Sequence, residues 1–161
     1  MKKGELKKLM EECLDQSKEL LLRDGYLMPV AFVMHKDNFD TIGLSFRDND
    51  EKNRQFTLLR KLVKEKNANT VFVIIESWYV ASNKKDLTIE PANHPMRKEC
   101  IMMIGECEEG NITIMQIFDR KDGEIIFGEK IDMTEMGEID SLKLDFGIKK
   151  KGQNKNLKEL S

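Results

Sequence analysis

Two apolar runs, Thr70-Val-Phe-Val-Ile-Ile-Glu-Ser-Trp-Tyr-Val80 and Cys100-Ile-Met-Met-Ile-Gly-Glu-Cys107, decide the fold of this chain. Both are rich in β-branched and large apolar residues, which indicates strands. In each run apolar side chains occupy both alternating positions, whereas a strand with one solvated face alternates apolar with polar residues. Both faces of these strands must therefore be covered, either by helices on two sides or by a second subunit.

The segment that joins the two strands, residues 82–98, is long and polar. Loops of this length between core strands are uncommon in small domains and are often functional. Unusual polar residues also gather here: Glu76 interrupts the first apolar run, and His94, Arg97 and Glu99 follow close together. We therefore expect any functional site at this end of the two strands.

Two helices are expected on either side of a hairpin. Apolar residues recur at three- and four-residue spacing from Leu6 to Leu21, and Asp24-Gly25 ends that helix, since glycine commonly follows a helix C-terminus. Residues Asp48 to Asp50 offer N-caps for a second helix that extends to about Lys66.

Further strands are predicted where apolar residues alternate between turn residues. They are expected over 26–36, 41–46, 112–118 and 124–133. Short turns between neighbours make most pairs antiparallel, so we predict an α+β fold: a mostly antiparallel sheet of about five or six strands with two main helices, in the order helix, hairpin, helix, meander. Residues 134–148 fit a helix and a strand equally well.

Composition indicates one soluble cytoplasmic domain. The chain has 161 residues and a net charge of −2, and its lysine-rich end, 149–161, carries +4, which leaves −6 on 1–148. We expect 1–148 to form a single domain and 149–161 to be a disordered basic tail. No run of about eighteen apolar residues and no apolar signal-peptide core is present, so we expect no membrane association.

The three cysteines predict neither a disulfide nor a zinc site. Their number is odd, and the odd separation of Cys100 and Cys107 places them on opposite faces of one strand. A metal site would require His94 and His35 to converge with carboxylates, and no spacing requires this. Phosphate loops, dinucleotide fingerprints and Gly-x-Ser-x-Gly elbows are absent from the sequence, so we expect no cofactor.

Nucleic acid is not an expected partner. The second helix has a basic face that includes Arg54, Arg60 and Lys61, but no aromatic residues for base stacking lie among these charges. Such a basic face is more often simply solvated.

The polar residues around the 82–98 loop allow two interpretations. Glu76 lies on an apolar face, where an unpaired carboxylate is costly to bury, and Arg97 has the strand parity of a partner. In the structural interpretation, which we favour, this ion pair holds the loop on the sheet. In the functional interpretation, Arg97 binds an anionic ligand while Glu76 or Glu99 transfers a proton. His94, between Asn93 and Pro95, suits a base or a plain loop residue.

Three separated motifs resemble those of a group of small uncharacterised prokaryotic proteins. They are Leu22-Arg-Asp-Gly-Tyr-Leu-Met-Pro29, Ile75-Glu-Ser-Trp-Tyr79 and His94-Pro-Met-Arg-Lys-Glu99. The group carries a similar series, DGY…P, SEAW and HPxRxE, and this chain departs from it with Ser77 where alanine is usual. No activity is assigned to the group. The resemblance implies only that Glu76, Trp78, His94, Arg97 and Glu99 belong to one site.

Two functions follow as hypotheses. The first is a self-associating, protein-binding module, most simply a homodimer, because a small chain with a two-sided apolar sheet has no catalytic signature. The second is a small enzyme, for example a hydrolase, with its site under the 82–99 loop. A concave pocket at these polar residues would favour the enzyme, and a flat packed cluster would favour the binding module.

Overall fold

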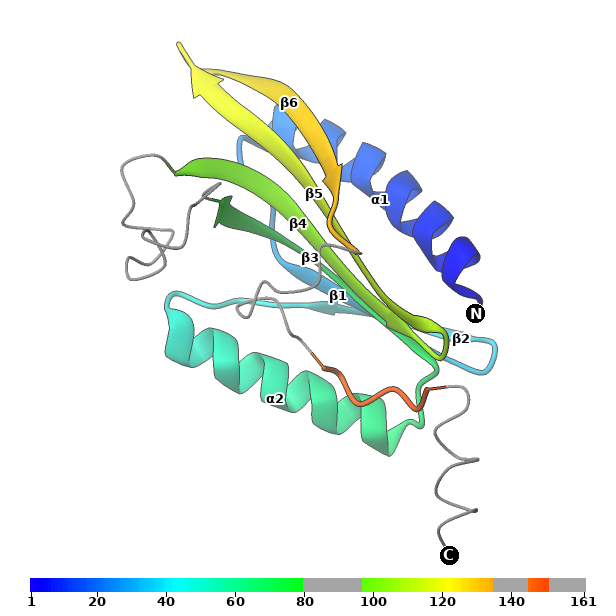
Figure 1. Ribbon diagram of the computed structural model, residues 1–161. Coiled ribbons are helices and arrows are strands. Elements are labelled where there is room, and N and C mark those ends of the chain that lie inside the picture. The colour runs from blue at the N-terminus through cyan, green and yellow to red at the C-terminus, as the bar shows by residue number, and fades with distance from the viewer. Residues whose placement is uncertain (80–96, 135–144, 151–161) are drawn as a thin grey trace, which may run out of the picture.

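A six-stranded antiparallel sheet lies between two helices in the computed structural model (Figure 1). The structure describes residues 1–79, 97–134 and 145–150. In chain order the elements are α1 (Lys3–Asp24), β1 (Val30–His35), β2 (Asn38–Gly43), α2 (Asn49–Glu65), β3 (Thr70–Tyr79), β4 (Lys98–Cys107), β5 (Gly110–Lys121) and β6 (Glu124–Asp132). The strands are ordered β2-β1-β3-β4-β5-β6. This confirms the predicted α+β class.

The two apolar runs form the middle strands, β3 and β4, and both of their faces are buried. On one face α1 packs over Phe72, Ile74, Ile101 and Met103. Gly105 of β4 allows this close approach, because a Cβ there would lie 2.6 Å from the Sδ atom of Met10. The prediction of a sheet buried on both sides is confirmed for these strands.

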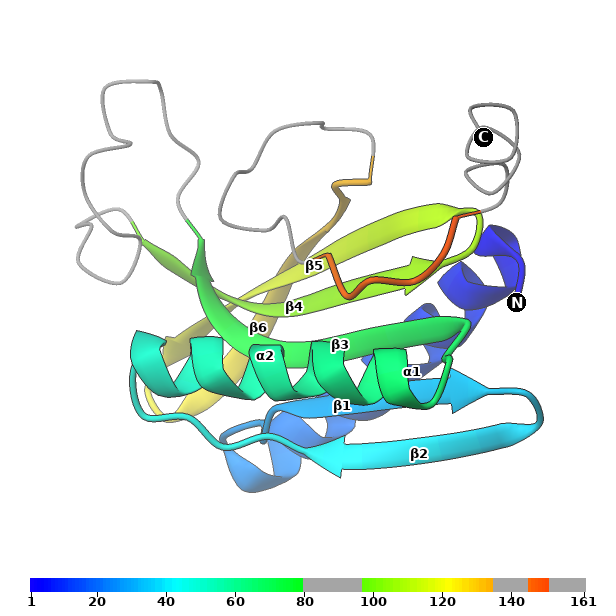
Figure 2. The same ribbon diagram turned by 90° about the horizontal axis from the view of Figure 1, so that it is seen from below.

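The opposite face is covered by α2 together with residues 145–150, as Figure 2 shows from a second direction. Phe56, Leu59 and Val63 of α2 pack there with Phe146 and Ile148. The cover therefore comes from the chain's own helices and from its last described segment, which is the first of the two possibilities that the sequence allowed.

Both helices begin or end at the residues that the sequence indicated. Gly25 follows α1 in the left-handed conformation, with φ of 79°, and its N–H donates to the Leu21 carbonyl at 2.8 Å. Asp48 caps α2 by accepting a hydrogen bond from the Glu51 N–H at 2.8 Å.

Two hairpin turns are tighter than predicted. The β1–β2 turn lies at Lys36 and Asp37, so β2 begins before the expected Thr41. The β5–β6 turn consists of Asp122 and Gly123, both with positive φ, as two-residue hairpin turns require. Residue 120, which falls between the predicted strands 112–118 and 124–133, is therefore part of β5.

Cys100 and Cys107 confirm the predicted opposite orientation on β4. Cys100 packs with the α2 side of the core, Cys107 with the α1 side, and both thiols are buried and free. The parts of 134–148 that the structure describes, Thr134 and residues 145–148, are neither helix nor strand. The division into a domain over 1–148 and a tail over 149–161 stays a prediction. In the described ranges, no helix combines the length and the apolar character that crossing a membrane needs.

Candidate functional site

Two carboxylates and one guanidinium meet at the end of the sheet, on the face that α1 covers. Glu76 of β3, Glu99 of β4 and Arg120 of β5 come from three consecutive strands. Arg120 donates from Nε to Glu99 Oε2 at 2.9 Å, and its Nη2 lies 3.7 Å from Glu76 Oε2. The three side chains form one ion-pair cluster, in which a single cation is shared by two anions.

The cluster also ties the sheet to the end of α1. Arg120 Nη1 donates to the Gly25 carbonyl at 2.7 Å, and the Leu27 N–H donates to Glu76 Oε1. Both partners belong to the turn that leaves α1, and the left-handed Gly25 makes that turn possible. The glycine that ends the helix is thus also the point where the charged cluster holds the chain.

Burial is the largest influence on Glu76 and raises the pKa of its carboxyl group. The negative charge of Glu99 raises that pKa further, while the Leu27 N–H and the Arg120 guanidinium lower it without cancelling the increase. Glu76 therefore holds a proton to a higher pH than a glutamate in water does.

Trp78 and Arg97 lie beside the cluster and contact each other. Trp78 is the strand partner of Glu99, and its ring is partly exposed. The Arg97 guanidinium carbon lies 4.7 Å from the centroid of that ring, which is cation–π geometry. Four of the five predicted site residues therefore lie at one end of β3 and β4: Glu76 and Trp78 in β3, Glu99 in β4, and Arg97 directly before β4. His94 lies outside the described residues.

The pairing expected for Glu76 is corrected. The cation that the structure places at its carboxylate is Arg120, whereas strand parity suggested Arg97. The error arose because a longer turn was predicted after Phe118, and this left Arg120 outside the strand. With β5 continuing to Lys121, Arg120 shares the face of Phe118 and reaches both carboxylates. The sequence did contain a signal for this: Arg120 lies two residues after Phe118, so in a strand that continues past Phe118 it lies on the same face.

A depression of about 370 Å³ adjoins the cluster, lined by Leu22, Gly25, Arg120, Gly123, Glu124 and Ile125. It shares only Arg120 with the ion-pair cluster, and that guanidinium already contacts both carboxylates and a carbonyl. Among the described residues, Glu76 and Glu99 thus pack against Arg120 and do not line the depression. The choice between a binding surface and a catalytic site stays a prediction.

The described residues contain no cluster of three or more His, Cys, Asp or Glu side chains placed to hold a metal ion. Burial raises the pKa of the Cys100 thiol to about 12, so this cysteine is a packed apolar side chain and a poor nucleophile.

Comparison with known proteins identifies a family. A family model described as bacteriophage lambda protein ea47 matches residues 1–159, nearly the whole chain, and the chain belongs to this family. No curated protein and no solved structure matches the chain. A phage family accords with the prokaryotic group that the motifs resemble, while the three-motif series itself stays a prediction. The family description states no activity, so function must be argued from the structure.

Proposed function

We propose that the chain is a self-associating, protein-binding module, and that two copies meet at the end of the sheet where α1 leaves the core. The observation that carries this proposal is a group of large apolar side chains that are exposed there. Leu22, Tyr26, Met28 and Trp78 are 56%, 60%, 62% and 39% exposed. We call these four residues the corner surface.

The contacts described above place the corner surface in one region. Tyr26 and Met28 flank Leu27, whose N–H bonds to Glu76, and Trp78 follows Glu76 on the same face of β3. Leu22 lines the depression that Gly25 and Arg120 also line. Single exposed apolar residues are ordinary on protein surfaces, but a gathered group of them marks an interaction site.

The composition of the corner surface is that of a protein–protein interface. Tyrosine, tryptophan, methionine and arginine are enriched in such interfaces, and a polar rim surrounds their apolar centre. Charges of both signs adjoin it: Arg97 contacts the Trp78 ring, Glu124 lines the depression with Leu22, and Arg23 and Asp24 follow Leu22 in sequence. A rim that carries both signs can complement an identical rim related by a twofold axis.

A second copy is the partner that the whole-chain charge also favours. The net charge of −2 is small for 161 residues, so electrostatic repulsion between two copies is weak. The buried sheet faces no longer argue for self-association, because the chain's own helices cover them, and the proposal rests on the corner surface.

Sedimentation velocity on matched variants tests the proposal. Tyr26→Glu with Met28→Glu places charge in the corner surface, whereas Leu58→Glu places it on α2, at a side chain that is 64% exposed. We expect the unaltered chain and Leu58→Glu to sediment as dimers, and the double variant as a monomer. Dimers of the double variant would show that the corner surface is not the interface.

A further inference from the structure

Glu106 is a charged side chain buried in the apolar core. It belongs to β4, where it follows Met102 and Ile104 on the face that α2 covers, and it is 1% exposed. Its strand partners are Val71 and Asn111. A carboxylate in such surroundings is stabilised only if several donors reach it.

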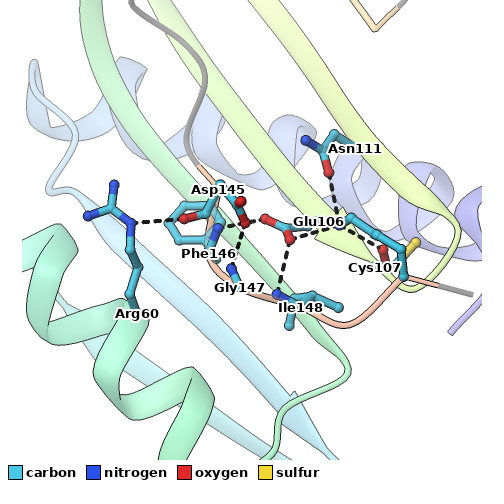
Figure 3. Close-up of polar contacts among 9 residues, drawn as sticks. Arg60, Glu106, Cys107, Asn111, Asp145, Phe146, Gly147 and Ile148 are labelled. Atoms are coloured by element: carbon cyan, nitrogen blue, oxygen red, sulfur yellow. Dashed lines mark hydrogen bonds and ion pairs between the residues drawn. The ribbon is translucent and has the colours of Figure 1, made fainter. Parts of the chain in front are cut away.

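All of the hydrogen-bond donors that the structure gives to the Glu106 carboxylate come from one short segment, residues 145–150 (Figure 3). The Phe146 N–H donates to Oε2 at 2.7 Å. The Ile148 N–H and the Lys150 ammonium donate to Oε1 at 3.1 and 2.7 Å. In the described part of the chain, neither the sheet nor α2 supplies a donor, so the stabilisation of the carboxylate depends on this segment.

Gly147 gives the segment the backbone shape that this contact needs. Its φ of 83° is a conformation that glycine adopts without strain, and its own N–H donates to Asp145 Oδ1 at 2.8 Å. The N–H groups on either side can then converge on one carboxylate, like the backbone nests that bind anions.

Further contacts hold the segment: the Asp145 carbonyl accepts a hydrogen bond from Arg60 Nε of α2 at 2.8 Å, and the other contacts come from side chains of the segment. Phe146 and Ile148 are buried, and the Phe146 ring centroid lies 6.3 Å from that of Phe56 on α2. Lys150 also donates to the Cys107 carbonyl and to Asn111 Oδ1, each at 3.2 Å. Backbone hydrogen bonds that hold a chain in place, with alternate side chains in separate sites, are how proteins bind short extended peptides.

We infer that the face of β4 and β5 beside α2 is a peptide-binding groove, that Glu106 is its specificity-determining group, and that residues 145–150 occupy it as an intramolecular ligand. The ligand class is a peptide with the pattern aromatic, glycine, aliphatic, any residue, lysine. Because the segment is part of the same chain, its effective concentration is high, and a partner peptide of this class can enter only after the segment leaves. This inference is independent of the corner surface.

Peptide binding to the full-length chain tests the inference. A fluorescent peptide with the sequence of residues 143–152 is titrated into the variant Phe146→Ser with Ile148→Ser, whose own segment holds the groove weakly, and binding is followed by anisotropy. We expect saturable binding of one peptide per chain. The unaltered chain should bind at least about tenfold more weakly, because its own segment competes.

Two controls assign the binding to Glu106. Adding Glu106→Gln to the variant chain should weaken binding about 10- to 100-fold, as expected for lost hydrogen bonds to a charged group. A peptide carrying Lys150→Met should lose a similar factor, whereas Lys149→Met, at an exposed position, should have no effect.

Circular dichroism checks that each variant chain is folded. If the double serine variant is unfolded, Gly147→Val replaces it, because this substitution keeps the Phe146 and Ile148 side chains but disfavours the positive φ of residue 147. Absence of binding to a folded variant, or binding that is unaffected by Glu106→Gln, would overturn the inference.

Discussion

The contact between Glu106 and Lys150 allows a stability prediction whose size follows from the structure. Glu106 is buried, Lys150 is 25% exposed, and their charged atoms are 2.7 Å apart. Removing one partner of a fully buried pair costs about 3–5 kcal/mol, and exposed pairs contribute about 0–1 kcal/mol. After Lys150→Met the carboxylate keeps two N–H donors, so we expect a loss of about 1.5–3 kcal/mol, the range for one hydrogen bond to a charged group.

Glu106→Gln should lower the free energy of unfolding by about 2–4 kcal/mol. The amide has one acceptor oxygen, and its NH₂ group must face either the Phe146 N–H or the pair formed by the Ile148 N–H and Lys150. At least one buried donor is then left without an acceptor, which costs about 1–3 kcal/mol, in addition to the lost charge-assisted bonds. In this background no buried anion remains, so Lys150→Met should cost about 1 kcal/mol or less, from its lost hydrogen bonds to the Cys107 carbonyl and Asn111.

A double-mutant cycle by urea unfolding measures this coupling. We expect a coupling energy of about 0.5–2 kcal/mol. Lys149→Met is the matched control, since its exposed side chain should change the free energy of unfolding by no more than about 0.5 kcal/mol. If Lys150→Met costs the same with and without the Glu106 carboxylate, Lys150 does not stabilise that carboxylate and the reasoning fails.

Three further predictions concern the ends of the sheet. Because burial raises the pKa of Glu76, the folded state binds more protons than the unfolded chain at pH values just above 4.5, the ordinary pKa of glutamate. The contribution of Glu76 to the free energy of unfolding should therefore fall as pH rises from 4.5. Urea unfolding at a series of pH values measures this fall, and Glu76→Gln should abolish it. Arg120→Met leaves two carboxylates without their shared cation and should lower the free energy of unfolding by about 1–2 kcal/mol. This is less than the value for a buried pair, because Arg120 is 39% exposed. Chemical unfolding measures the change, with Lys121→Met as the control. For Asp132, burial acts to raise the pKa, but hydrogen bonds from Thr134 and Lys7 outweigh burial and lower the pKa to about 2. This carboxylate therefore stabilises the fold above its ordinary pKa and loses that effect as pH falls toward 2. In acid unfolding, Lys7→Met should lose less stability than the unaltered chain over this pH range.

Local sequence signals predicted much of the fold because they describe local physics. The glycine that ends α1, the aspartate that caps α2 and the two-sided apolar strands each act through neighbouring residues or through strand parity. Cys100 and Cys107 were assigned to opposite faces for the same reason, and the structure confirms that assignment.

The polar partners were harder to predict, because they depend on strand length and on contacts between distant residues. Arg120 was missed when the turn after Phe118 was predicted to be too long. Glu106 interrupts an apolar run as Glu76 does, and the same signal could have found it. Its partner segment was ambiguous between helix and strand because its conformation follows from the distant carboxylate and has no regular period.

Sedimentation equilibrium on the unaltered chain tests the proposed self-association most directly. Across low to high micromolar concentrations, the proposal predicts that the average mass rises from the chain mass of 18.7 kDa toward twice that value. A mass that stays at 18.7 kDa over the whole range would contradict it.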